Sequence, residues 1–212
     1  GATHGKGTVQ SLLALDELAP TSIQIEGMPR FGALKLTQQS YYRINGRGVQ
    51  MKGITADILL PDPAAHIESG ERFHDYPVPW DEISKAKYEL WDGKLGDIDA
   101  LKKASAARIG TNEYFRTLKR RVALLDTRNK ETVMPLSKKE FDEQSAREQR
   151  ELDELKLDDE VQRFSVEPIR YEKSTRPRVA ADDEAEKDWK EGLASDPWVE
   201  EALYIIGEMA KK

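Results

Sequence analysis

The chain has 212 residues, of which 38% are hydrophobic and 34% are charged, and its net charge is -6. A nucleic-acid-binding protein concentrates basic side chains on one surface, so this acidic balance argues against DNA or RNA as a partner. The absence of cysteine excludes disulfides and thiolate metal sites. The sequence has no apolar run of about 18 residues and no signal-peptide pattern, so we expect no membrane span.

Residues 1 to 61 are expected to form strands and turns. β-branched and aromatic residues are punctuated there by glycines, as is typical of short strands. The expected strands are Thr8–Gln10, Ile23–Ile25, Ala33–Ile44 and Val49–Leu60. The dipeptide Asn45-Gly46 predicts a tight turn that joins the last two in a hairpin. A segment of this length does not close a sheet alone, so we expect exposed edges that favour dimerisation.

The next part of the chain is expected to be a connector followed by helices. Prolines at positions 61, 63, 77 and 79 exclude regular helix from this stretch. After it the hydrophobic period becomes helical. A helix over residues 111 to 128 is predicted by one apolar stripe, formed by Phe115, Leu118, Val122 and Leu125.

A second helix is predicted to begin near residue 137. Ser137 and Glu140 have the spacing of a capping box. Leu136 and Phe141 have the spacing of a hydrophobic staple, which would fix the direction of the entering chain. The opposite face of this helix is almost wholly charged, as in a solvated helix.

The last quarter of the chain contains a charged stretch and a final helix. Residues 167 to 190 mix proline, arginine and acidic residues, so we expect a mobile or extended segment. Asp196 as N-cap and Pro197 in the first turn predict a helix that runs towards the C-terminus.

These patterns predict an α+β fold, in which a short strand and hairpin segment precedes a mainly α-helical domain. We expect three parts: residues 1–62, a proline-rich connector at 63–80, and a helical domain at 81–212.

The segment Gly5-Lys6-Gly7-Thr8-Val9-Gln10 is the sharpest local feature of the sequence. A phosphate-binding P-loop needs four residues between its first glycine and a Gly-Lys pair that is followed by Ser or Thr. Here only three residues separate Gly1 from the Gly5-Lys6 pair, and Gly7 stands in place of the hydroxyl residue. The P-loop interpretation is therefore excluded.

This segment instead resembles the lysine segment of the carboxy-terminal processing proteases. Four other parts of the chain are similar to these proteases or to the C-terminal domain of their tail-specific branch. They are the run from Tyr42 to Ile58, Ser69-Gly70-Glu71, Pro79 to Ile83, and the helical stretch from Ala107 to Lys130. The resemblance covers residues 1 to about 160 and is more specific than any one motif.

The resemblance implies a catalytic role for two residues. In that family a serine is the nucleophile, a lysine is its general base and a glutamine orients the lysine; the matching positions are Lys6 and Gln10. A protonated lysine cannot accept a proton, so such a site must desolvate the amine and give it a neutral hydrogen-bond acceptor. On a strand, positions 6 and 10 face the same side.

The resemblance further implies that the chain is the C-terminal part of a periplasmic serine endopeptidase. Such an enzyme processes or degrades proteins from their unstructured C-termini, and a lipoprotein adaptor is an expected partner. The family's serine precedes the lysine, but only five residues precede Lys6 here, so we expect the 212-residue chain alone to be inactive. Ser105 is expected on a helix surface and not as a nucleophile. The alternative function is a helical docking or scaffold module, formed by residues 81–212, that binds the protease core or an adaptor.

The histidines and Trp80 are better explained by ordinary structural roles than by catalysis or ligand binding. His4, His66 and His74 lack the spacing of a metal site and are expected on the surface. We therefore expect no metal and no cofactor. Trp80 is predicted either to anchor the packing of helices or to dock the helical domain onto the protease core.

Overall fold

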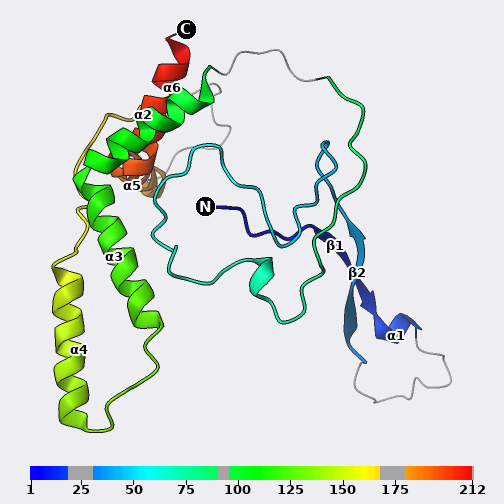
Figure 1. Cartoon of the computed structure of the whole chain (residues 1–212), viewed down its shortest axis with the longest axis horizontal. Coiled ribbons are helices and arrows are strands. Elements are labelled where there is room, and N and C mark those ends of the chain that lie inside the picture. The colour runs from blue at the N-terminus through cyan, green and yellow to red at the C-terminus, as the bar shows by residue number, and fades with distance from the viewer. Residues whose placement is uncertain (19–30, 90–95, 168–179, 212) are drawn as a thin grey trace. The chain divides into compact units, whose positions relative to one another are not determined.

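The computed structural model describes residues 1–18, 31–89, 96–167 and 180–211 (Figure 1). The chain divides into two compact units. The strand unit comprises Ala2–Ala56 and Glu68–Asp92, and the helical unit comprises Asp57–Ile67 and Gly93–Lys212 together with Gly1. Strands in one unit and helices in the other confirm the predicted α+β class.

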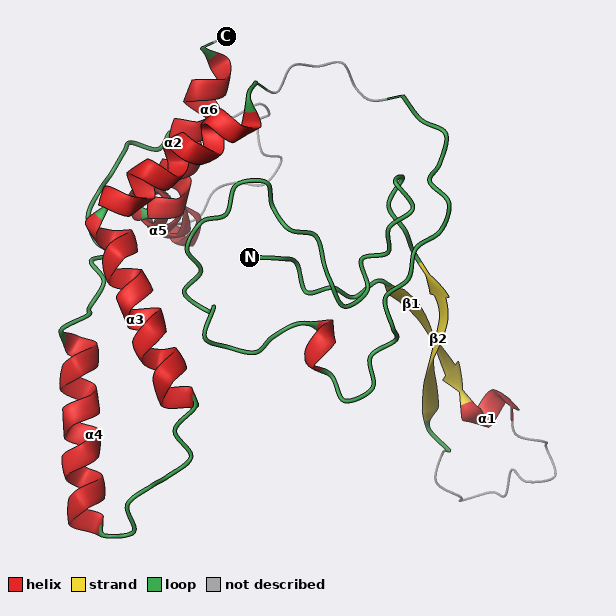
Figure 2. Cartoon of the chain, viewed as in Figure 1, coloured by secondary structure: helices red, strands yellow, loops and turns green. Residues whose placement is uncertain are grey.

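The strand unit contains an antiparallel ribbon of two strands, β1 (Thr8–Ala14) and β2 (Ala33–Ser40), as Figure 2 shows. The short helix α1 (Leu15–Leu18) follows β1. A register shift next to Val9 marks a β-bulge. Strands were predicted at both places, but β1 continues beyond Gln10 and β2 ends before Ile44. The predicted strand at Ile23–Ile25 lies outside the described residues.

The predicted turn at Asn45-Gly46 forms, whereas the strand predicted at Val49–Leu60 does not. The amide of Gly46 donates to the carbonyl of Arg43 at 2.8 Å. Beyond the turn the chain folds back, because Met51 has a positive φ of 62° and the amide of Gly53 donates to the carbonyl of Val49 at 2.8 Å. An extended ladder is incompatible with these local turns.

Residues 80–83, at the end of the expected connector and just beyond it, return to this loop and form hydrogen bonds with it. The amide of Ile83 donates to the carbonyl of Gly46 at 2.8 Å. The indole Nε1 of Trp80 donates to the carbonyl of Gly48 at 2.8 Å, and Lys52 Nζ lies 3.2 Å from the centre of the Trp80 ring. Trp80 therefore packs against a loop of the strand unit, so the prediction that it anchors helix packing was wrong.

In the described part of the helical unit there are five helices, α2 to α6. They are α2 (Ile98–Thr111), α3 (Glu113–Asn129), α4 (Lys138–Asp153), α5 (Ala180–Ser195) and α6 (Pro197–Ala210). The core centres on Ile109, Phe115 and Leu118, with Trp198 of α6 packed against it. The apolar stripe predicted over 111–128 thus faces the core on α3. None of the described helices is both long and apolar enough to cross a membrane.

Helix α2 buries one face, which includes Ser105. Leu101, Ser105 and Ile109 recur at every fourth residue and are buried, with Ser105 at 0% exposure. The prediction that Ser105 lies on a helix surface was therefore wrong. A small side chain at the middle position fits a tightly packed face.

Helix α4 begins where it was predicted to begin, but without the predicted cap. Ser137 is the N-cap residue, yet its hydroxyl makes no capping hydrogen bond, and Leu136 is fully exposed and cannot staple to Phe141. At the opposite, C-terminal end of α4, two arginines of α3 bind its backbone carbonyls. Arg121 Nη1 donates to the carbonyl of Leu152 at 3.2 Å, and Arg128 Nη2 donates to the carbonyl of Glu148 at 2.7 Å.

Part of the stretch predicted to be mobile or extended is helical. Residues 180 to 190 belong to α5, where Lys190 and Glu186 form an i,i+4 ion pair at 2.9 Å that favours helix. Residues 168–179 lie outside the described part of the chain. The final helix α6 is confirmed, since the Asp196 carboxylate accepts from the amides of Trp198 at 2.7 Å and Val199 at 3.0 Å.

Candidate active-site segment

The segment that carries Lys6 is held by backbone hydrogen bonds to three other parts of the strand unit. The amide of Met51 donates to the carbonyl of Gly5 at 2.7 Å, and the amide of Glu71 donates to the carbonyl of His4 at 2.8 Å. Tyr41 binds the segment twice, because its hydroxyl donates to the carbonyl of Lys6 and its amide donates to the carbonyl of Gly7 at 3.0 Å. The backbone position of Lys6 is therefore fixed from both sides.

Glycine is required on either side of Lys6 because the 50–53 loop lies directly against the backbone there. A Cβ atom at Gly7 would lie 2.5 Å from the amide nitrogen of Gln50. Gly5 has a φ of 88°, and a Cβ atom there would lie 3.0 Å from the carbonyl carbon of Met51. In the structure these glycines accommodate the chain's own backbone.

A substitution at Gly7 tests this close packing. We expect Gly7→Ala to lower the opening free energy of the β1–β2 ribbon by about 1–3 kcal/mol, because a backbone neighbour must shift to admit the methyl group. Hydrogen exchange of the ribbon amides measures this change. Gly110→Ala on α2 is the matched control, since nothing lies within 4 Å of its Cβ position. An equally small effect of both substitutions would contradict the prediction.

Gln50 connects the Lys6 segment to Glu71 and was not anticipated from the sequence. Its side chain is almost fully buried, with 2% of the residue exposed. The Gln50 Oε1 accepts from the amide of Gly7 at 2.7 Å, and its Nε2 donates to Glu71 Oε1 at 2.9 Å. A buried amide with both ends satisfied fixes its neighbours, because breaking either bond leaves a polar group without a partner. No local pattern marks this glutamine, since its partners are distant in sequence.

The side chains of Lys6 and Gln10 are placed differently. Lys6 is exposed, whereas Gly5 and Gly7 beside it are buried. Gln10 is half-buried on β1, and its Nε2 donates to the hydroxyl of Thr37 on β2 at 3.1 Å. Within the described residues no hydrogen bond joins Lys6 to Gln10. The catalytic pairing of these two residues stays a prediction.

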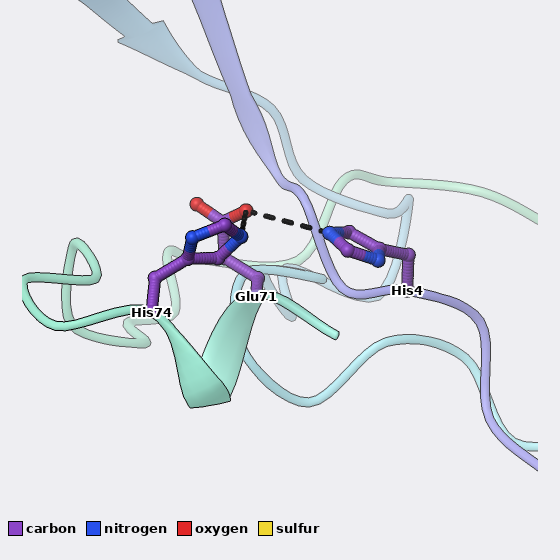
Figure 3. Close-up of side chains that lie close together, drawn as sticks. All are labelled: His4, Glu71 and His74. Atoms are coloured by element: carbon purple, nitrogen blue, oxygen red, sulfur yellow. Dashed lines mark ion pairs between the residues drawn. The ribbon is translucent and has the colours of Figure 1, made fainter. Parts of the chain in front are cut away.

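Two of the three histidines lie together beside this segment. His4 and His74 both approach the carboxylate of Glu71, as Figure 3 shows. His66 belongs to the helical unit, where its carbonyl accepts from Asn129 Nδ2 at 3.0 Å. The spacing of the histidines along the sequence gave no sign that two of them would converge.

Comparison with known proteins identifies the larger part of the chain. Residues 64–211 match the family model described as the C-terminal domain of tail specific protease (DUF3340). The chain is also similar to a tail-specific protease of Haemophilus influenzae (strain ATCC 51907 / DSM 11121 / KW20 / Rd), with 32% identity over 160 residues. This alignment covers 72% of the chain and 22% of the relative, so the chain spans about a fifth of that protein's length. The match to the family model begins after Lys6 and Gln10. By these similarities, the chain belongs to the tail-specific protease family and carries its C-terminal domain.

Proposed function

We propose that the chain provides the general base and the C-terminal domain of a periplasmic serine endopeptidase that degrades or processes proteins from unstructured C-termini. The nucleophilic serine comes from sequence outside these 212 residues. The single observation that carries the proposal is the conformation of the Lys6 segment. Its backbone is bound on both sides, while the Lys6 side chain stays exposed. This arrangement favours an interaction of the Lys6 amine with a group outside the segment.

In this proposal, residues 1–62 are the end of the catalytic domain, residues 63–80 are a connector and residues 81–212 are the helical domain. The β1–β2 ribbon supports this assignment. Its outward side chains include large apolar residues, among them Leu12 at 72% and Leu34 at 48% exposure. A two-stranded ribbon gains stability when such side chains pack against further strands or another layer. The remainder of the catalytic domain would supply that cover, and a second copy of the ribbon would otherwise do so.

The general-base role places a requirement on whatever surrounds Lys6. An amine accepts a proton from a serine hydroxyl only when it is neutral, and burial of the amine favours the neutral form. Since Lys6 is exposed in this chain, the rest of the catalytic domain and the bound substrate must cover it. Gln10 would have to exchange its bond with Thr37 for one with Lys6, which is a small change for an exposed side-chain pair.

A second role, as a docking platform, is supported by the surface of α6. Leu203, Tyr204 and Ile206 are large apolar side chains, and each is about half exposed. Exposed apolar groups that lie close together on one helix are typical of a protein contact. The partner would be the protease core or a lipoprotein adaptor. This role is compatible with the enzymatic one for the longer protein.

The proposal is tested by comparing the full-length protein with the 212-residue chain on one protein substrate that has an unstructured C-terminus. We expect the full-length protein to cleave it and the 212-residue chain to leave it intact, because the chain has no serine in the required position. The matched substrate has the same sequence with its C-terminus closed by a folded domain, and its cleavage should be much slower. Cleavage by the 212-residue chain alone would contradict the proposal.

A further inference from the structure

Three side chains with metal-binding atoms converge in the strand unit. Glu71 Oε2 lies 3.8 Å from His4 Nε2 and 3.9 Å from His74 Nε2. One ligand atom from each residue can be chosen so that all three lie within 4.8 Å of one another. Figure 3 shows both imidazole rings directed at the same carboxylate, one from the segment before β1 and the other from beyond the 3-10 helix Glu71–Phe73.

The backbone holds these three residues in place. The amide of Glu71 donates to the carbonyl of His4 at 2.8 Å, and the amide of His74 donates to the carbonyl of Glu71 at 3.2 Å. The backbone of Glu71 is therefore hydrogen-bonded directly to the backbone of each histidine. Because the backbone positions are set, rotation of the side chains alone decides how closely their ligand atoms approach.

The carboxylate is also oriented by a buried partner. Glu71 Oε1 accepts a hydrogen bond from Gln50 Nε2, and Gln50 is itself fixed by the amide of Gly7. The Glu71 side chain is only 13% exposed, and its other carboxylate oxygen, Oε2, faces the two imidazoles. An outer hydrogen-bond partner that orients a ligand carboxylate is a regular part of protein metal sites.

We propose that His4, Glu71 and His74 bind one zinc ion, with a fourth coordination position open to solvent. Two imidazole nitrogens and one carboxylate oxygen are a ligand set that zinc takes with three protein groups and one water. Ligand atoms around a tetrahedral zinc lie roughly 3.3 Å apart, given metal–ligand distances of about 2.0–2.1 Å. The present separations must shorten, and His4 and His74 have the freedom to do so because their side chains are 58% and 63% exposed.

Zinc at this position would link the Lys6 segment to the chain around residue 71. His4 lies two residues before Lys6, and in the described structure it is joined to Glu71 by one backbone hydrogen bond and by the long contact with the carboxylate. A metal bridge would replace the latter with two coordinate bonds. The inference does not depend on a catalytic role for Lys6, so its failure would leave the proposed function intact.

Isothermal titration of the 212-residue chain with zinc chloride, after removal of bound metals by a chelator, is the test. We expect one zinc ion per chain. His4→Ala and His74→Ala, which change exposed side chains and should preserve the fold, are each expected to weaken the affinity at least about tenfold. His66→Ala is the matched control, because it removes an imidazole outside the cluster and should leave the affinity unchanged. Circular dichroism of each variant verifies that the fold is retained.

The outcomes separate a specific site from incidental binding. Equal affinities for His4→Ala and the unsubstituted chain, or no heat of binding at about 1 mM zinc, would overturn the proposal. A second readout is the histidine side-chain region of the NMR spectrum. The resonances of His4 and His74 should shift on addition of zinc while those of His66 stay in place. A shift confined to His66 would equally overturn it.

Discussion

Replacement of Lys6 by alanine in the full-length protease is expected to lower its peptide-cleavage rate by about 10³-fold. In the proposed mechanism the amine takes the proton of the serine hydroxyl as the hydroxyl attacks the peptide carbonyl, and it later passes a proton to the leaving amine. Alanine removes this group and adds nothing that could take its place. The substitution should be structurally mild, because the Lys6 side chain is exposed and its backbone bonds are independent of it.

The matched control is Lys35→Ala, which removes another exposed lysine from the strand unit. Lys35 lies on β2, opposite Leu12, and the proposed mechanism gives it no role. Its replacement should leave the cleavage rate unchanged, so that a loss specific to Lys6 cannot be attributed to the charge of the ribbon. Single-turnover cleavage of a peptide, with enzyme in excess at a saturating concentration, measures the chemical step in both variants.

Lys6→Arg distinguishes a general base from a positively charged anchor. Arginine keeps the positive charge but does not lose its proton in proteins, so it cannot act as the base. We expect Lys6→Arg to be as inactive as Lys6→Ala. If Lys6→Arg cleaves at the normal rate, Lys6 contributes only charge; if Lys6→Ala does, the assignment of the base is wrong.

Sequence patterns predicted the elements that depend on local interactions. Asp196 and Pro197 start α6 as expected, because an N-cap carboxylate and an N-terminal proline act on the neighbouring amides. The apolar stripe through Phe115 and Leu118 correctly gave α3 and its buried face. The turn at Asn45-Gly46 also formed, since its geometry is set within a few residues.

The features that the sequence did not reveal depend on contacts between distant segments. Val49–Leu60 has strand-forming residues, but its backbone bonds to the Lys6 segment instead of to a neighbouring strand. The roles of Gln50 and of the histidine pair arise only after the chain has brought residues 4, 50 and 71 together. For the candidate site, a family motif in the sequence indicated Lys6, whose catalytic role stays a prediction. The hydrogen bonds that hold the backbone of its segment, from Tyr41, Met51 and Glu71, are visible only in the folded chain.

A cluster of ion pairs joins α2 and α6 in the helical unit, and its loss should strongly lower the stability of that unit. Arg108 Nε and Nη2 donate to the carboxylate of Glu201 at 2.8–3.1 Å, and Nη1 donates to Glu208 Oε1 at 2.6 Å. The hydrogen bond to Glu201 is the largest cause that raises the pKa of Arg108 above its ordinary value. Glu201 is 4% exposed, so its charge depends on this guanidinium for compensation.

We therefore expect Arg108→Met to lower the free energy of unfolding of the helical unit by about 3 kcal/mol, because it leaves a buried carboxylate without its partner. Urea unfolding followed by circular dichroism at the helical band measures the loss. Arg116→Met is the matched control on α3. Its partner Glu113 lies 3.2 Å away and both side chains are largely exposed, so the expected loss is below about 0.5 kcal/mol.

The double variant Arg108→Met/Glu201→Leu separates the cost of an unpaired charge from the contribution of the pair itself. When both members are replaced by apolar side chains no buried charge remains, and most of the stability should return, since well-packed apolar groups often match a buried ion pair. The double variant should then be more stable than Arg108→Met alone. If it is less stable, the pair holds α2 and α6 together by its own attraction, and packing of apolar groups between these helices cannot substitute for it.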